Sequence, residues 1–357
     1  MSDPSPKQRF DELEARSAAI LACPRPPATM GTIVGRSREG REIRALKIGV
    51  GARRVSLLAG CHADEPVGPR LLRRLSHYLF GLAADDPLLV NYQWWIVPHM
   101  NPDGAVRNER WQPSSATTYD LADYLLHSVR ELPGDDIEFG FPIDPDDADA
   151  RPENRAVYAW WRSAAGPFDL HVSLHGMAFG AGPWFLIEEA WKDRVTRLKR
   201  RCLQRVAEMG YVPHDIDRRG EKGFFRLDRG FCTRPDSRYM RAHFLELGDV
   251  RTANEFRPSS METIRGLGGD PLTLVSEMPL FITPGVGETL GPPDPVAELW
   301  KERIAGWRAD LQAGASPADL LDEAAAAGVA PMPVNDQMKL QWTLVVAGLE
   351  AFAHFAT

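Results

Sequence analysis

Cysteine is scarce in this 357-residue chain, and the four cysteines present lie far apart. They are Cys23, Cys61, Cys202 and Cys232, and no two of them form a Cys-x-x-Cys pair. Such spacing fits neither a disulfide framework nor a zinc site made of thiolates. The thiols are therefore expected to be reduced.

Long apolar runs and an excess of positive charge are missing as well. No stretch approaches the roughly 20 apolar residues of a membrane span, and the first residues, MSDPSPKQRF, lack the apolar core of a secretory signal. The 42 basic and 49 acidic residues give a net charge of −7, which disfavours nucleic acid and anionic membranes as partners. We expect a cytoplasmic protein with neither kind of partner.

The rest of the composition is that of a globular protein, with 44% apolar and 25% charged residues. The sequence shows no internal repeat, no low-complexity tract and no clear linker. This length suits one large α/β domain. A single domain over residues 1–357 is therefore expected, with helical additions at about 294–336.

Short apolar runs alternate with segments of helical spacing. The segment GTIVGRSREGREIRALKIG predicts a hairpin, and VSLLA at 55–59 predicts a strand buried on both faces, followed by a helix from Pro66. This alternation predicts an α/β fold with a mostly parallel or mixed central sheet and helices on both faces. Further strands are expected at 92–97, 168–174, 184–187 and 272–276. Helices are expected at about 9–21, 121–130, 192–205, 294–330 and 338–355.

Polar residues follow several of these strands at their carboxyl ends. The loop GCHADE follows residues 55–59, the turn PHMNPDG follows residues 92–97, and His175 and Glu277 end two later strands. In open α/β sheets, ligands bind beyond the carboxyl ends of the strands. The sequence therefore predicts a site at this edge.

His62 and Glu65 stand three residues apart in the first of these loops. An imidazole nitrogen and a carboxylate suit Zn²⁺, which keeps one position open for water in catalytic sites. The spacing alone is weak, because acidic residues also stabilise the N-terminus of a helix. On these two residues alone, a helix start remains the simpler interpretation.

Four segments in order, GCHADEPVGPRLLRRL, PHMNPDG, SLHG and LVSEMPLF, resemble the zinc carboxypeptidase family. The resemblance runs along nearly the whole chain and is closest to the bacterial and cytosolic branch. It implies one zinc ion per chain, held by His62, Glu65 and His175. His171, two strand positions from Ser173, is expected to be a packed or hydrogen-bonded residue instead.

The resemblance also implies the catalytic groups. Glu277 matches the family's general base and acid, which a zinc hydrolase needs to move the proton of the attacking water. Arg110 occupies the place of the arginine that stabilises the oxyanion, and Arg107 is a competing candidate.

One departure concerns the end of the substrate. The family grips a terminal carboxylate with an Asn-Arg pair, but the matching segment DDIEFGFP has Glu138 and Phe139 there. An arginine clamps a carboxylate in a bidentate manner, whereas a glutamate repels it. A tyrosine at the family's usual distance before Glu277 is also missing, with Tyr239 the nearest.

The resemblance implies a zinc-dependent hydrolase of amide bonds, acting on a peptide or a small amide, with an atypical pocket for the end of the substrate. Two alternatives stay open. One is a small-molecule deacylase of the aspartoacylase or desuccinylase type, and the other is a non-catalytic zinc-binding protein on the same fold. The sequence predicts no oligomeric state.

Overall fold

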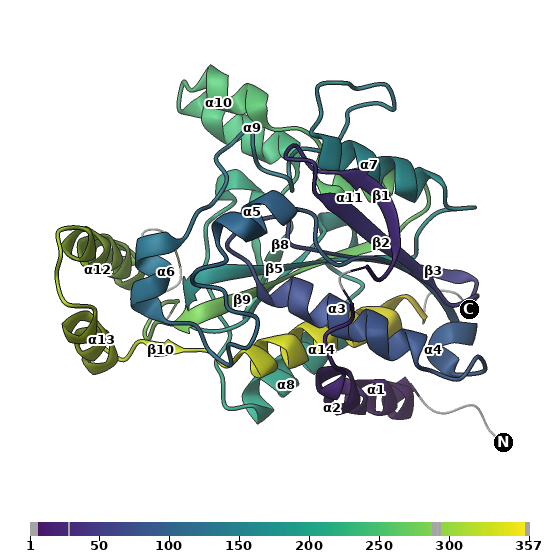
Figure 1. The fold of residues 1–357 in the computed structure, drawn as a ribbon, viewed down its shortest axis with the longest axis horizontal. Coiled ribbons are helices and arrows are strands. Elements are labelled where there is room, and N and C mark those ends of the chain that lie inside the picture. The colour runs from purple at the N-terminus through teal and green to yellow at the C-terminus, as the bar shows by residue number, and fades with distance from the viewer. Residues whose placement is uncertain (1–5, 28, 288–290, 292–293, 354–357) are drawn as a thin grey trace.

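The computed structural model describes residues 6–27, 29–287, 291 and 294–353. Within these ranges the strands join one sheet in the order β1-β2-β4-β3-β5-β9-β6-β8-β7, and β10 pairs with β9 at one end (Figure 1). The strands are β1 Thr32–Arg36, β2 Glu42–Ile48, β3 Arg53–Ala59, β4 Tyr92–Val97, β5 Leu170–Gly180, β6 Trp184–Ile187, β7 Arg226–Asp228, β8 Phe231–Thr233, β9 Leu272–Ile282 and β10 Ala330–Pro331.

The centre of the sheet is parallel, and beyond it every described pair except β6 with β8 is antiparallel. β4, β3, β5 and β9 run parallel, as the crossover from β3 into a helix requires. β2 joins β4 antiparallel, and β6 joins β9 antiparallel. The α/β fold with a mixed sheet is therefore confirmed, and β1 and β2 form the expected hairpin.

Two strands are longer than the sequence predicts. β5 was expected to end at Leu174 and β9 at Ser276, yet both continue, paired from Leu170 and Leu272 as far as Gly180 and Ile282. Each extension satisfies the backbone groups of the other, so the polar residues do not end the strands. β3 stops at Ala59, opposite Leu174, so His175 is the first β5 residue beyond that pairing.

The central strands are buried on both faces, which explains their nearly continuous apolar sequence. In β4, Trp94 and Ile96 enter the larger apolar cluster, whereas Trp95 and Val97 enter a second one. The larger cluster contains the last helix, α14, and the second contains residues of α7 and α11. Figure 1 shows α3 and α14 on one side of the sheet and α7 and α11 on the other.

The expected helices are present with shifted bounds. The N-terminal helix is split in two, and the last helix starts four residues earlier than predicted. The predicted end of that helix, at 354–355, lies outside the described residues. The helices are α1 Pro6–Ala15, α2 Ser17–Ala22, α3 Val67–Phe80, α4 Pro87–Val90, α5 Pro102–Arg107, α6 Leu121–His127, α7 Pro152–Arg162, α8 Thr196–Glu208, α9 Ser237–Glu246, α10 Val250–Glu255, α11 Ser260–Gly266, α12 Pro295–Gln312, α13 Pro317–Ala326 and α14 Val334–Ala353, with short 3₁₀ turns at Glu189–Trp191 and Glu221–Gly223.

Helix α8 carries the basic segment. Its apolar stripe, Leu198, Cys202 and Val206, is buried, as expected. Arg201 and Arg205 form ion pairs with acidic side chains of α14 and α1, which accounts for part of the positive charge. No helix within the described ranges combines the length and the apolar content that crossing a bilayer needs.

The start of α3 packs tightly on β5, and Gly68 makes this possible. A Cβ atom at Gly68 would lie 2.6 Å from the backbone oxygen of Leu174 and 2.9 Å from its Cβ. We predict that Gly68→Ala lowers the free energy of unfolding by about 1–3 kcal/mol through overpacking. Urea denaturation of the two proteins measures this loss in the free energy of unfolding.

A matched control is Gly306→Ala in α12, where a Cβ atom would meet nothing within 4 Å. This change is expected to stabilise the protein by about 0.5–1 kcal/mol, because alanine favours a helix over glycine. Equal effects of the two substitutions would contradict the packing argument.

Candidate metal centre

Three side chains converge where β3 ends and β5 continues. His62 and Glu65 lie on the loop between β3 and α3, and His175 lies on β5. The two Nδ1 atoms are 3.1 Å apart, and the Glu65 carboxylate is 2.6 Å from Nδ1 of His62 and 2.9 Å from Nδ1 of His175. The structure thus gathers the three residues that the sequence predicts as ligands.

These distances suit a tetrahedral metal ion. Donors about 2.1 Å from a tetrahedral centre lie roughly 3.4 Å from each other, and the separations here, 2.6–3.1 Å, are somewhat shorter. The three residues present one ligand atom each, all within 4.8 Å. Two imidazole nitrogens and a carboxylate are a donor set that zinc uses in hydrolases. The residues therefore fit the zinc ion that the family resemblance implies.

Each histidine has a carboxylate near its second ring nitrogen. Asp136 Oδ1 lies 3.3 Å from Nε2 of His62, and Glu138 Oε2 lies 3.4 Å from Nε2 of His175. Ser173 Oγ lies 2.8 Å from the same Nε2 of His175. Acceptors at these positions hold the proton on Nε2 and leave Nδ1 free to bind a metal. Asp136 and Glu138 thus support the donor set.

The electrostatics of the cluster favour a cation. Burial alone would lower the pKa of His62, but the carboxylates of Glu65 and Asp136 raise it to about 10. Burial would raise the pKa of Glu65, but His62, His175 and Arg130 hold it well below its usual range. The carboxylates therefore stabilise a positive charge on the histidines. A metal ion bound between the same side chains would be stabilised in the same way.

A second group, Cys61 with Glu138 and His175, also brings three potential ligand atoms together. Burial, with Glu138 next, raises the pKa of the Cys61 thiol to about 12. A metal binds the thiolate and not the thiol. The set with His62 and Glu65 is therefore the better metal site.

Glu277 lies beside the cluster on β9. It is paired in register with His175, so both side chains leave the same face of the sheet. Burial, followed by the charge of Glu65, raises the pKa of the Glu277 carboxyl to about 8. A carboxyl tuned upward in this way is suited to accept and return a proton near neutral pH.

Arg130 is the arginine nearest the cluster, and the sequence did not indicate it. Its guanidinium lies 3.1 Å from Glu65 and 2.9 Å from Asp64. Its positive charge opposes the rise in the pKa of Glu277. Arg110, predicted for the oxyanion, is exposed and has no described contact with these residues. Arg107 is also exposed and pairs with Glu39 at 2.6 Å.

Glu138 is buried and its charge is compensated. The sequence had suggested a carboxylate that repels the carboxylate end of a substrate. Arg234 donates to Oε1 of Glu138 at 2.6 Å, and Ser260 donates to the same atom at 2.7 Å. Arg234 hence keeps the pKa of Glu138 low against the effect of burial. Phe139 is half-buried and packs edge-on against Phe256. Neither side chain presents a free charge.

Other sequence expectations concern residues around the cluster. His171 is buried and hydrogen-bonded to Ser56 and Ser260, as predicted. Tyr239 lies near Glu189 and has no described contact with the cluster. Asp136 stood in the quoted segment DDIEFGFP without an assigned role, and Arg234 had no motif at all. Both are recruited from segments far away along the chain, where no local pattern marks them.

His, Glu and His side chains beside a strand-borne glutamate form a candidate metal site of the kind that metal-dependent hydrolases use. Residues 24–181, less than half of the chain, match the zinc carboxypeptidase family. The predicted resemblance is thereby confirmed, and the chain is related to the zinc carboxypeptidases through this segment. The matched segment contains His62, Glu65 and His175, whereas Glu277 lies beyond it.

Characterised carboxypeptidases match a similar part of this chain. Carboxypeptidase SOL1 of Arabidopsis thaliana is 33% identical over 132 residues, which are 36% of this chain and 24% of that protein. Carboxypeptidase D of Drosophila melanogaster is 33% identical over 160 residues, which are 41% of this chain and 11% of that protein. The chain thus spans a quarter or less of the length of these relatives.

Solved structures with a similar fold include two bacterial enzymes. A metallo-carboxypeptidase from Pseudomonas aeruginosa, in complex with (2-guanidinoethylmercapto)succinic acid, is 15% identical with a TM-score of 0.48, over 98% of this chain and 69% of that one. A metallo-carboxypeptidase from Burkholderia cenocepacia is 16% identical with a TM-score of 0.47, over 97% of this chain and 70% of that one.

The metal assignment predicts about one tightly bound zinc ion per chain. His62→Ala and His175→Ala are each expected to lose the metal, because each removes one of three ligands. Atomic absorption after dialysis measures the zinc content, and His243→Ala is the control, since His243 contacts only the Phe244 ring among the described rings. Full zinc content in both ligand variants would refute the assignment.

The Glu138–Arg234 pair predicts strong coupling in stability. Both side chains are nearly buried, so Glu138→Gln or Arg234→Met alone leaves an uncompensated charge and is expected to cost about 3–5 kcal/mol. The double variant is expected to cost much less than the sum. Denaturant unfolding of the four proteins measures the coupling, and additive losses would show that the pair is not a unit.

Proposed function

We propose that this protein is a zinc-dependent hydrolase of amide bonds, similar to the metallocarboxypeptidases. The observation that carries the proposal is the convergence of His62 Nδ1, Glu65 and His175 Nδ1 on one point, with Glu277 in register beside it. His62, Glu65 and His175 are proposed to hold one zinc ion per chain.

Glu277 is proposed as the general base and acid. When bound, zinc lowers the pKa of its water to about 7 and polarises the scissile carbonyl. The Glu277 carboxylate takes a proton from the attacking water and returns it to the leaving nitrogen. This role is supported by its neighbour, His175, and by the raised pKa of the Glu277 carboxyl.

Arg130 is proposed to stabilise the oxyanion that forms during attack. A guanidinium fixed in place before the reaction stabilises developing negative charge without further reorganisation. Asp64 and Glu65 fix Arg130 by ion pairs, and 47% of its side chain stays accessible to a substrate. Arg110 remains the alternative for this role, since it matches the family's arginine by its place after NPDG.

The end of the substrate is proposed not to be a free carboxylate. A cavity of about 230 Å³ beside the cluster includes Arg130, and every arginine that lines it is paired with an acidic side chain. Glu138 and Arg234 also neutralise each other, and Phe139 supplies no charge. Apart from Arg130, which is proposed for the oxyanion, every cation among these residues already has an acidic partner and is not free to clamp a carboxylate. These arginines are Arg38, Arg107, Arg130 and Arg151.

Several broader features belong to the same proposal. The substrate is proposed to be a peptide or a small amide, and the described residues are proposed to form one catalytic domain, because their strands share one sheet. The four unpaired cysteines support a reducing compartment such as the cytoplasm.

The two alternative functions are less well supported. A deacylase of the aspartoacylase type and a non-catalytic zinc protein would each use the same three ligands. The family match to zinc carboxypeptidases favours a peptidase-like enzyme over the deacylase. The presence of Glu277 and Arg130 beside the donors argues against a protein without turnover.

Hydrolysis of a substrate panel tests the proposed function. Peptides with free and with amidated C-termini and acyl-amino acids are incubated with zinc-loaded protein, with and without a chelator. We expect chelator-sensitive cleavage, with the amidated peptides preferred. Glu277→Gln is expected to keep its zinc while kcat falls by about 10²–10⁴. Unchanged turnover of this variant would remove Glu277 from the mechanism.

Arg130 and Arg110 give a direct comparison between structure and resemblance. Arg130→Gln is expected to lower kcat by about 10²–10³, the usual cost of losing one oxyanion donor, while zinc content stays at one per chain. Arg110→Gln, on an exposed loop, is the matched control and is expected to change kcat less than twofold. The reverse result would restore Arg110 to the oxyanion role.

A further inference from the structure

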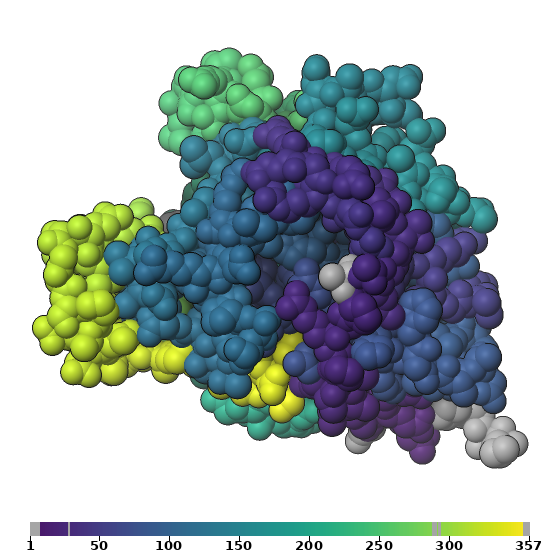
Figure 2. Space-filling view, in the orientation of Figure 1, coloured from purple at the N-terminus to yellow at the C-terminus, as the bar shows by residue number. Residues whose placement is uncertain are grey.

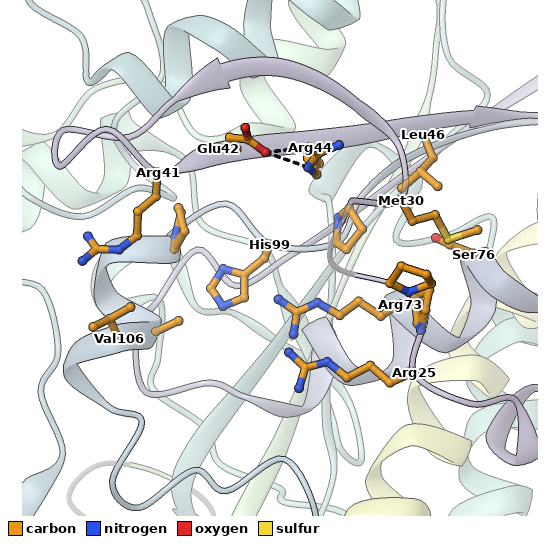
Figure 3. A pocket seen from close by; sticks show the side chains of 15 residues that line it. Arg25, Met30, Arg41, Glu42, Arg44, Leu46, Arg73, Ser76, His99 and Val106 are labelled. Atoms are coloured by element: carbon orange, nitrogen blue, oxygen red, sulfur yellow. Dashed lines mark hydrogen bonds and ion pairs between the residues drawn. The ribbon is translucent and has the colours of Figure 1, made fainter.

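A second cavity, of about 290 Å³, lies between the segment before β1, helix α3 and the turn after β4. Figure 3 shows the guanidinium groups of Arg25 and Arg73 side by side, pointing the same way beneath the ring of His99. None of the metal-cluster residues lines this cavity. In Figure 2 the surface is hollowed between the purple N-terminal part of the chain and the blue part.

The two arginines have no acidic partner among the described residues. Arg41 and Arg44, which also line the cavity, are paired with Asp103 and with Glu42. Arg25 and Arg73 take part in no described ion pair or hydrogen bond, and Arg73 is half-buried. Burial, followed by the charge of Arg25, lowers the pKa of Arg73 to about 10. Two close guanidinium groups without a counter-charge are unfavourable unless an anion joins them.

His99 adds a neutral donor to the same cavity. Its Nδ1 accepts a hydrogen bond from the backbone N–H of Asn101 at 3.2 Å, so the ring proton lies on Nε2. Burial, followed by the charge of Arg73, lowers the pKa of His99 to about 3, so the ring stays neutral. The imidazole thus offers one N–H and no positive charge.

The remaining walls are largely apolar and come from Pro26, Met30, Leu46 and Val106. A cavity of this size holds more than an inorganic ion, and mixed apolar and cationic walls are typical of sites for small organic anions. Guanidinium groups bind phosphate and carboxylate oxygens in a bidentate manner. We propose that Arg25, Arg73 and His99 bind the oxyanion of a small, partly apolar molecule, a phosphate monoester or a carboxylate.

The cavity also touches the elements that build the metal centre. The His99 ring lies against Gly60, where a Cβ atom would be 2.8 Å from His99 Nδ1, and Gly60 precedes the metal loop. Asn101, at the start of α5, donates to Glu131, which in turn accepts from the backbone N–H of Ala63 in that loop. The proposed anion site therefore lies next to residues that contact the loop carrying His62 and Glu65.

Calorimetric titration of the zinc-loaded full chain tests the site. The probes are inorganic phosphate, phenyl phosphate and benzoate at constant ionic strength. We expect saturable binding of phenyl phosphate or benzoate, tighter than that of inorganic phosphate, and the stronger of the two identifies the oxyanion. Failure of all three probes to bind at 10 mM would overturn the proposal, whether or not the protein hydrolyses amides.

Substitutions locate the binding. Arg73→Gln is expected to weaken the preferred probe about tenfold or more, since it removes a charge-assisted contact. Without ligand, the same variant is expected to melt at a higher temperature than the wild type, because an uncompensated charge is gone. Arg251→Gln, exposed on α10, is the control and is expected to change neither quantity. Unweakened binding by Arg73→Gln would place the anion elsewhere.

Discussion

The pairing of β5 with β9 is the interaction on which the rest of the site depends. These strands stay in register beyond the point where β3 ends, from Leu170 opposite Leu272 to Gly180 opposite Ile282. Because β3 leaves the sheet at Ala59, its loop can turn across the uncovered edge of β5 and bring His62 and Glu65 to His175. Without the continued pairing, neither His175 nor its neighbour on β9 would have a defined position. Helix α14 also holds His175 in position, because the side chain of Gln341 donates a hydrogen bond to the backbone oxygen of His175.

The metal centre and the cavity at Arg73 differ in how far their charges are compensated. Around the metal centre the buried carboxylates of Glu138 and Glu65 are paired with Arg234 and Arg130, although no hydrogen bond or ion pair is described for the nearby Glu277. Such networks cost little only when all of their members are satisfied. Around Arg73 the balance is broken, because a half-buried guanidinium faces another and no acid. The first pattern prepares a site for a cation, and the second leaves a place for an anion.

The departure from the family motif has a structural counterpart. A glutamate at position 138 would be unfavourable beside a substrate carboxylate, but it is acceptable as a partner of His175 and Arg234. Arg234 follows β8, on a segment far from DDIEFGFP, and reaches Glu138 only because β6 and β8 extend the sheet next to β9. Glu138 is therefore compensated by a basic residue on another element, and the two together keep the region neutral.

The sequence by itself determined the central strands, several of the helices around them, the loop GCHADE and the ordered motifs that indicate His62, Glu65 and His175. These are local properties, since apolar periodicity and short spacings persist whatever the chain does elsewhere. It also indicated Glu277, although not that the strand continues past it. It did not indicate β7, β8 and β10 or helices α9–α11. Only the tertiary structure decided the lengths of β5 and β9, because strand ends depend on what pairs with them. It likewise decided that Arg130 and not Arg110 lies beside Glu65, because a side chain's neighbours across 65 residues of sequence follow from packing and leave no trace in local spacing.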